Sequence, residues 1–377
     1  MLKGINLTLM IGPAAPVPVP EFVLDALTEI SVTHDDTGSS GFMLNFKVSK
    51  DSPLQLLYLL GGGGSIVPFM RAMIIVTMNG KPNVIMDGMI TNHQLQPGTD
   101  KNSALLSLTG EDLTTVMDRQ EFSGLPFPAM PAEARVALLV AKYSFLGIIP
   151  MVIPSVLIDT PIPTSRIESQ EGTDLAYIRK LADRVGYVFY IEPGPQPGMN
   201  IAYWGPKIKV GKPQPALNMD MDVIKNIENI SFQFDNSLNT IPTVFYYDEV
   251  SKVPITVPVP PVTPLNPPLG MVPPIPTRLE SVSDELSKYS LPKAIMIGLA
   301  MASNRTDAVS GSGSLDVLRY GNILKARQLV GVRGVGLPYN GLYYVNKVEH
   351  KIKRGSYKQS FELSRNGLIS TLPNIPV

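Results

Sequence analysis

The sequence predicts an α+β chain that is mainly β. Two similar β-domains, an α/β region between them, and a proline-rich and helical insertion in the second domain are expected. Three observations carry this prediction: one spacing of residues occurs twice, the offset between the two copies changes once, and amphipathic helical patterns separate the copies. With 377 residues, 44% of them hydrophobic and 17% charged, the chain is long enough for two or three packed domains.

The repeated spacing relates residues 89–110, MITNHQLQPGTDKNSALLSLTG, to residues 346–367, NKVEHKIKRGSYKQSFELSRNG. At a constant offset of 257, eight positions carry the same or a closely similar residue. The matched pairs are His93 and His350, Gly98 and Gly355, Thr99 and Ser356, Lys101 and Lys358, Ser103 and Ser360, Leu106 and Leu363, Ser107 and Ser364, and Gly110 and Gly367. Agreement at one spacing over this length predicts an internal duplication.

Further upstream the offset changes to 200, because residues 30–37, ISVTHDDT, match residues 230–237, ISFQFDNS. The second copy therefore carries 57 additional residues, and residues 254–310 differ from the rest in composition. Ten prolines lie between Val253 and Thr277, followed by a helical stretch and the segment SNRTDAVSGSGS. The predicted division is a first β-domain over 1–110, an α/β domain over 111–212, a second β-domain over 213–253 and 311–377, and an insertion over 254–310.

Strand patterns dominate both copies. Apolar runs with alternation occur in FMLNFKVSK, MRAMIIVTMNG, VIMDGMIT and ALLSLTG of the first copy, and in ISFQFD, TVFYYDEV, LVGVRGV and LYYVNKVEH of the second. A single antiparallel meander leaves two unpaired edges. Closure into a barrel or pairing with neighbouring chains removes them.

Two helices are predicted between the copies. Pro131 and Gly147 frame a helix through AEARVALLVAKYSFL. A second helix begins after Thr173 as N-cap and ends at Gly186, with an apolar face of Leu175, Ile178, Leu181, Ala182 and Val185. A strand is expected directly afterwards, from Tyr187 to Ile191.

The proline-rich segment, residues 253–277, is expected to be an extended arm on the outside of the molecule. Proline lacks a backbone donor and favours polyproline-like extension, so this segment does not fit a sheet interior. Its apolar residues fit docking into a groove of a partner, or an arm that folds back on its own domain.

Composition excludes several classes of function. The 32 basic and 32 acidic residues balance, which disfavours nucleic-acid binding, and the absence of cysteine excludes disulfides and thiolate metal sites. The longest apolar stretch, 145–158, is interrupted by Pro150 and Pro154, so no membrane span is expected. The N-terminal segment MLKGINLTLMIGPAAPVPVP fits a strand and a proline linker better than a secretory signal, because its apolar run alternates.

Candidate chemical groups do not form a recognisable catalytic or metal-ligand pattern. The only histidines are His34, His93 and His350, and a structural role in the hairpins is the favoured interpretation for the last two. Acidic pairs occur at Asp35 and Asp36, at Glu111 and Asp112, and at Asp220 and Asp222. Adjacent residues of a strand point to opposite faces, so only Asp220 and Asp222 can share one. No catalytic, cofactor-binding or metal-binding residue is therefore predicted.

Two further patterns have a simple interpretation. The glycines at 61–64 lack the Gly-Lys-Ser/Thr of a phosphate-binding loop and fit a flexible loop. Residues 347–365 contain six basic residues, which fit a solvated face and, as the less favoured alternative, an acidic partner. They are Lys347, Lys351, Lys353, Arg354, Lys358 and Arg365.

Several segments resemble the tail hub proteins of contractile injection machines, namely the phage late control protein D family and the hub part of VgrG proteins of type VI secretion. The resemblance covers most of the chain. It is carried by DDTGSSGFMLNFKV, LTGEDLTTVMDR, QEGTDLAYIRKLADRVGYVFYIEPG and RGVGLPYNGLYYVNKVEHKIKRGSYKQSFELSRNGL.

The resemblance implies a homotrimer in which each chain supplies two tube-like β-barrel domains. Such a hub joins a six-fold tail tube above to a three-fold spike below and contacts other baseplate proteins of the virion after synthesis in the host cytoplasm. VgrG chains continue into a spike, whereas this sequence stops at Val377, which implies a separate spike protein. No enzyme activity, cofactor, membrane or sequence-specific nucleic acid is expected. The alternative is a tail-associated cell-wall hydrolase.

Overall fold

The computed structural model describes residues 4–13, 15–49, 70–98, 103–155, 167–220, 225–236, 240–247, 254–258, 267–274, 278–281 and 307–372. The glycines at 61–64, Asp222 and the predicted helix of the insertion lie outside these residues. Across the described residues, no helix has both the length and the apolar character needed to span a membrane.

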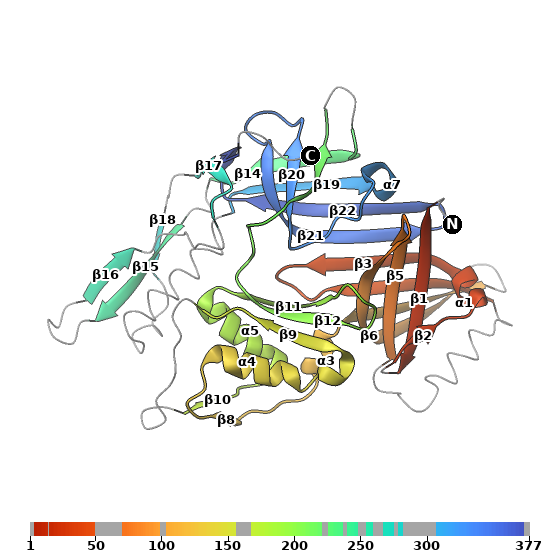
Figure 1. Ribbon diagram of the computed structural model, residues 1–377, viewed down its shortest axis with the longest axis horizontal. Helices are drawn as coiled ribbons and strands as arrows, with labels where there is room; N and C mark the ends of the chain where they lie inside the picture. The colour runs from red at the N-terminus through yellow and green to blue at the C-terminus, as the bar shows by residue number, and fades with distance from the viewer. Residues whose placement is uncertain are drawn as a thin grey trace.

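A 13-stranded sheet organises the molecule (Figure 1). Its main path runs in the order β14, β19, β22, β21, β3, β4, β7, β6, β5, β1, β2, and β20 joins β13 to β21. From the first part of the chain come β1 (Ile5–Pro13), β2 (Val17–Pro18), β3 (Leu27–Asp35), β4 (Gly41–Ser49), β5 (Met70–Met78), β6 (Lys81–Pro97) and β7 (Ser103–Asp112). From the last part come β13 (Gln214–Asn218), β14 (Asn229–Phe234), β19 (Val309–Asp316), β20 (Leu329–Arg333), β21 (Gly341–Lys353) and β22 (Ser356–Arg365).

The mainly β prediction is confirmed, but the strands do not form two separate closed barrels. Within the described strands the sheet is open, and β21 pairs directly with β3 over Lys347–Lys353 and Glu29–Asp35. The two groups of strands also share one hydrophobic core, in which Ile30, Leu44 and Phe46 lie with Val345 and Phe361. Because the groups bury their apolar faces together, neither needs to close on itself.

The α/β region forms a separate core below this sheet in Figure 1. Its central sheet has the order β11 (Val188–Pro193), β12 (Asn200–Gly205), β9 (Ile148–Val152), and β8 (Pro126–Phe127) pairs with β10 (Glu168–Ser169). Its helices are α3 (Thr114–Met117), α4 (Ala132–Ala141), the 3₁₀ turn η1 (Ser144–Leu146) and α5 (Asp174–Val185). Two short helices, α1 (Glu21–Ala26) and α7 (Val317–Tyr320), accompany the large sheet.

Local signals explain where the helices of this region begin and end. The Thr173 side chain accepts from the backbone N–H of Ala176, and Gly186 ends α5 in a left-handed conformation with φ of 69°, as predicted. Helix α4 begins after Pro131 but stops at Ala141, five residues before the predicted end, because the chain tightens into η1. Gly147, with φ of 76°, then turns it into β9.

The insertion is built differently from the prediction. Strand β15 (Thr240–Tyr247), expected in the second β-domain, lies in a separate sheet between β16 (Pro254–Pro258) and β18 (Arg278–Ser281). Strand β16 is an edge of that sheet, a position that tolerates its prolines. Strand β17 (Gly270–Val272) pairs with β23 (Leu368–Ser370), and Leu269 is buried, so this part of the proline-rich segment folds back on its own chain.

Candidate functional site

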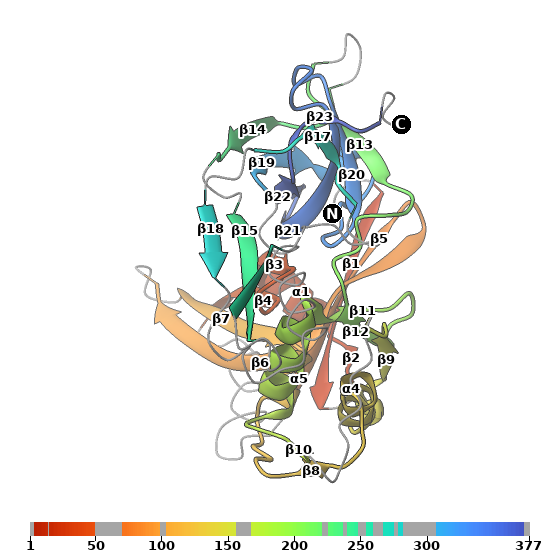
Figure 2. The same cartoon turned by 90° about the vertical axis from the view of Figure 1, so that its left-hand side faces the viewer.

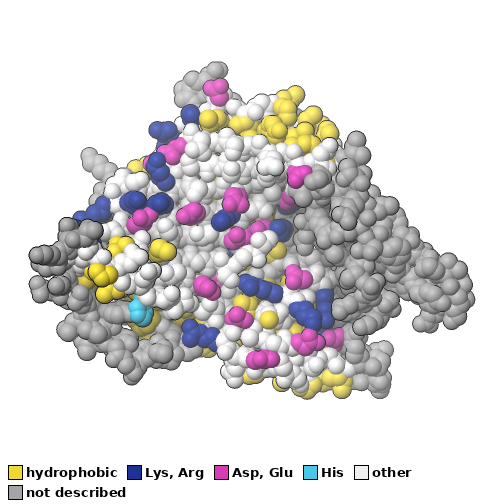
Figure 3. All heavy atoms as spheres, turned by 180° about the vertical axis from the view of Figure 1, so that it is seen from behind, with side chains coloured by type: hydrophobic (Ala, Val, Ile, Leu, Met, Phe, Trp, Pro, Cys, Tyr) yellow, Lys and Arg dark blue, Asp and Glu magenta, His cyan; other side chains and the backbone are white. Residues whose placement is uncertain are grey.

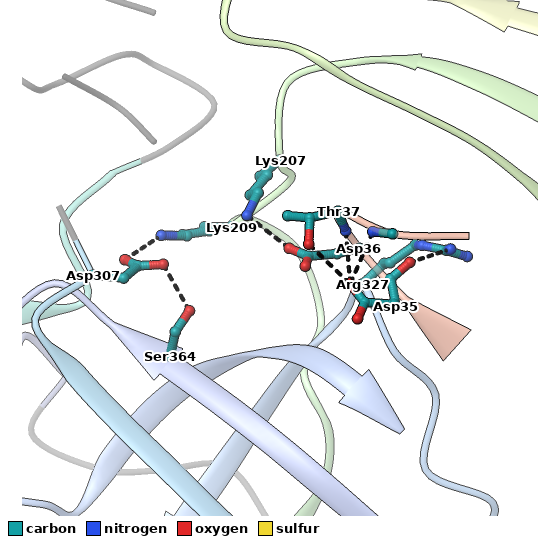
Figure 4. Close-up of polar contacts among 9 residues, drawn as sticks. Asp35, Asp36, Thr37, Lys207, Lys209, Asp307, Arg327 and Ser364 are labelled. Carbon is teal, nitrogen blue, oxygen red and sulfur yellow. Dashed lines mark hydrogen bonds and ion pairs between the residues drawn. The ribbon is translucent and has the colours of Figure 1, made fainter. Parts of the chain in front are cut away.

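A group of buried and partly buried charged side chains lies where the two strand groups meet the α/β region (Figure 4). Four segments contribute to it: Asp36 follows β3, Lys207 follows β12, Asp307 precedes β19, and Arg327 precedes β20. We refer to Asp36, Lys207, Lys209, Asp307 and Arg327 as the junction cluster. Its members come from the first, middle and last parts of the chain.

Two lysines of the junction cluster neutralise two aspartates. Lys207 Nζ lies 2.7 Å from Asp36, and Lys209 Nζ lies 2.6 Å from Asp307. Burial raises the pKa of Asp36, and the nearby Lys207 ammonium offsets part of that rise. Burial alone would also raise the pKa of Asp307, but Lys209 and a hydrogen bond from Ser364 outweigh burial, and the pKa is lowered.

Arg327 fastens the turn after β3 to the α/β region. Its guanidinium donates to the carbonyl of Asp35 (2.6 Å) and to Ser40 Oγ (3.1 Å), and it lies 3.9 Å from the ring centre of Tyr190 on β11. Asp35 closes the same turn by accepting from the backbone N–H groups of Thr37 and Gly38. These bonds lower the pKa of Asp35 although burial acts in the opposite direction.

One pair in this region has the composition of a nucleophile and a base. Ser364 Oγ donates to Asp307 Oδ2 at 2.6 Å. A carboxylate whose pKa is lowered is a weak base, and an ammonium 2.6 Å away holds it in the charged form. The pair is suited to fixing β22 against the start of β19, not to activating a hydroxyl.

The structure brings two of the three histidines together. The rings of His34 and His350 lie 5.5 Å apart, edge to face. Nε2 of His34 donates to the carbonyl of Ile85 (2.7 Å), and Nδ1 of His350 lies 2.7 Å from the hydroxyl of Tyr357. Burial lowers the pKa of both, that of His34 to about 4, so both imidazoles are neutral near pH 7.

Both rings line a pocket that also contains Glu192 and Arg327. Its volume is about 110 Å³, smaller than the roughly 300 Å³ at which pockets for small-molecule ligands begin. Burial raises the pKa of Glu192, and Arg327 and Lys325 counteract it. Since ring nitrogens of both histidines bond to the protein itself, this arrangement serves the packing of β3 against β21.

His93 and His350 do not occupy equivalent places in their hairpins. His93 is exposed and pairs with Leu108, whereas His350 is 3% exposed and pairs with Gln359. The connection between β6 and β7 is longer than that between β21 and β22, which shifts the register. The structural role proposed for His350 therefore rests on its own contacts.

The acidic pair Glu111 and Asp112 is divided between the surface and the interior. Asp112 is buried and accepts from the backbone N–H groups of Thr114 and Ser40, while neighbouring Glu111 accepts from the hydroxyl of Thr115 on the surface. Within the described residues, no group of three His, Asp or Glu side chains is arranged to hold a metal ion.

The basic residues of the C-terminal hairpin are paired within the chain. Their partners lie at 2.7–3.7 Å in five cases: Lys347 with Glu362, Lys351 and Lys353 with Glu29, Arg354 with Asp25, and Lys358 with Glu228. The sixth, Arg365, is buried and donates to the carbonyls of Asn340 and Pro338. Figure 3 likewise shows basic and acidic side chains interspersed on one face of the molecule. These contacts favour the solvated-face interpretation over an acidic partner.

No protein-family model matches the chain, and no curated protein matches it in sequence. Among solved structures, the tail protein from Neisseria meningitidis MC58 aligns with 97% of this chain and 98% of its own, with a TM-score of 0.65 and 14% identity. The chain has the fold of this tail protein. The resemblance to tail hub proteins seen in the sequence is thus confirmed for the fold.

Two further structures share this fold. The 43 kDa tail protein of prophage MuSo2 from Shewanella oneidensis covers 96% of this chain and 98% of its own, with a TM-score of 0.60 and 10% identity. The E. coli c3393 protein, a component of the type VI secretion system with structural similarity to the T4 bacteriophage tail proteins gp27 and gp5, covers 93% and 78%, with a TM-score of 0.54 and 9% identity.

Proposed function

We propose that this protein is a structural hub of a phage tail or a related injection machine. In this role it is a homotrimer that joins a six-fold tail tube to a three-fold spike, within a virion baseplate. The observation that carries the proposal is the full-length agreement with the Neisseria and Shewanella tail proteins.

The order of the strands supports the proposed duplication within the chain and, with it, the adapter role. The first strand group has the order β3, β4, β7, β6, β5, β1, and the second has the order β14, β19, β22, β21, β20, β13, so each strand except the two-residue β2 has a counterpart. The end pairs differ, since β1 and β5 are antiparallel and β13 and β20 are parallel. Three chains with two such units each present six similar units, as an adapter between six-fold and three-fold parts requires.

The proposed domains follow from this duplication. The first unit covers residues 1–110, the α/β domain 111–212, and the second unit 213–253 and 311–377, with 254–310 as the insertion. We propose that the exposed part of the insertion contacts another baseplate protein, since Met271 is 61% exposed and Val272 is 47% exposed.

A structural role fits the chemistry of the buried polar groups better than hydrolysis does. Each junction-cluster aspartate is paired with a lysine, and both buried histidines bond to groups of the protein itself. These contacts hold strands and turns together.

The test is co-expression with the tail tube and spike proteins of the same machine, followed by mass measurement and negative-stain microscopy. A particle containing three copies between tube and spike is the expected result. Purified protein that releases soluble fragments from peptidoglycan, with no trimer in any mixture, would instead support the hydrolase.

A further inference from the structure

Among the described residues, β14 and the distal half of β6 each have an unpaired edge, as do β13, β2 and most of β1. Strand β14 pairs only with β19, and the distal half of β6, residues 91–97, pairs only with β7 because β5 reaches no further than Met89. Figure 2 shows β14 at the upper left and the β6–β7 hairpin projecting at the lower left. Unpaired edges of this length are sites for strand addition.

Leu95, on the distal half of β6, is an apolar residue left exposed on the core face of the sheet. It pairs with Leu106, which is 5% exposed and belongs to the core, so its side chain lies on the core face of the sheet. Nevertheless, Leu95 is 50% exposed. The core face of this hairpin is therefore incomplete in a single chain.

The chain itself contains a template for completing it. At the junction of the two strand groups, β21 pairs antiparallel with β3, and His350 lies opposite Val32. The counterpart of β21 is β6, and the counterpart of β3 is β14. Both of those counterparts have an unpaired edge at the corresponding place.

The residue pairs between neighbouring strands show which residues of the two strand groups correspond. From Ile30 the ladder passes through Leu44 and Leu108 to His93, and from Ile230 it passes through Gly313 and Phe361 to Val348. His93 thus corresponds to Val348, and Leu95 to His350. The breaks in pairing register support this correspondence. One interrupts β6 between Ile90 and Asn92, and the other interrupts β21 at the corresponding place, between Val345 and Lys347.

We propose that β14 of one copy adds to the free edge of β6 in the next copy, antiparallel, with Leu95 opposite Phe232. The proposal rests on the homotrimer of the proposed function and names the strands that hold it together. Repeated three times, the contact uses the edges of β14 and β6 in every chain and closes a ring of six units.

The side chains of the two edges match in this register. On one face, Gln94 and Gln96 lie opposite Gln233 and Ser231, so polar groups meet polar groups. On the core face, Leu95 and Pro97 lie opposite Phe232 and Ile230, both of which pack partly against the core. A slip by one residue would place amides against aromatic rings, which makes this register specific.

The test uses cysteine pairs, because the chain has no cysteine of its own. Gln94→Cys with Gln233→Cys places two thiols directly opposite on the polar face of the proposed contact. The matched control, Gln94→Cys with Ser310→Cys, moves the second thiol one strand inward, since Ser310 pairs with Gln233. That shift adds roughly 4.8 Å and takes the pair beyond the roughly 7 Å limit for a disulfide.

After oxidation with diamide, the Gln233 variant should give about ten-fold more disulfide-linked chains than the control on a non-reducing gel. In a second measurement, Leu95→Lys should convert the trimer to a monomer with unchanged circular dichroism. Leu105→Lys, on the opposite face of the same hairpin, should leave the trimer intact.

Two outcomes overturn the proposal in different ways. A trimer that neither forms the linked product nor responds to Leu95→Lys refutes this contact and leaves the hub function standing. A wild-type chain that stays monomeric even with its tube and spike proteins refutes both.

Discussion

Replacing Arg71 by methionine should weaken the attachment of the α/β region to the large sheet. Arg71 lies on β5 and forms a bidentate pair with Asp87 on β6, with both nitrogen–oxygen distances at 2.6 Å. The pair is almost completely buried, and it reaches the α/β region because Arg71 also donates to the carbonyl of Leu146 and Asp87 accepts from Asn200.

The expected loss follows from leaving the Asp87 carboxylate buried without its guanidinium. Removing one partner of a buried ion pair costs about 3–5 kcal/mol. With a urea dependence of about 2 kcal/mol per M, the unfolding midpoint should fall by about 1.5–2.5 M. Trp204, the single tryptophan, is fully buried on the same strand as Asn200, so its fluorescence reports unfolding of this region.

The control is Arg354→Met. Arg354 pairs with Asp25 at 2.9 Å, but both side chains are largely exposed, at 67% and 72%. Exposed pairs contribute under about 1 kcal/mol. If Arg71→Met costs no more than Arg354→Met, the pair does not anchor the α/β region and the reasoning is refuted.

Three other predictions address the sheet and the insertion. Because the pKa of His34 is lowered to about 4, the unfolded chain binds a proton at His34 at a higher pH than the folded chain does. The free energy of unfolding should therefore be highest above about pH 6.5 and fall by about 3 kcal/mol towards pH 4. His34→Gln should remove this pH-dependent loss in urea titrations at several pH values. Gly110→Ala places a Cβ against the ring of Phe42 and should lower the free energy of unfolding by about 1–3 kcal/mol. Gly355→Ala, at φ of 80° with no atom within 4 Å, should lower it by only about 1–2 kcal/mol through backbone strain. A larger loss of stability for Gly355→Ala than for Gly110→Ala in thermal unfolding would contradict this. Leu269→Ala should speed hydrogen exchange in β17 and β23 while leaving exchange in β3 unchanged. If the substitution changes the exchange rates of β17 and β23 no more than that of β3, the pairing of β17 with β23 does not depend on Leu269.

The sequence by itself determined the elements whose signals are local. Thr173 and Gly186 delimit α5 because a cap and a left-handed glycine satisfy hydrogen bonds within a few residues of themselves. The sequence also predicts the hairpin of β21 and β22 from a local signal, since its side chains alternate between core and solvent.

Only the tertiary structure decided which strands lie side by side. The junction cluster and the contact of His34 with His350 join segments that are distant in sequence, and nothing local in their residues marks them. The pairing of β15 with β16 and β18 instead of the large sheet is likewise absent from its own alternation pattern. The register implied by matching His93 with His350 lies two residues away from the register of the strand pairing, because the two hairpin connections differ in length and an ungapped match of residues does not show this. Strand pairing is set by burying one shared core, and that depends on all the strands at once.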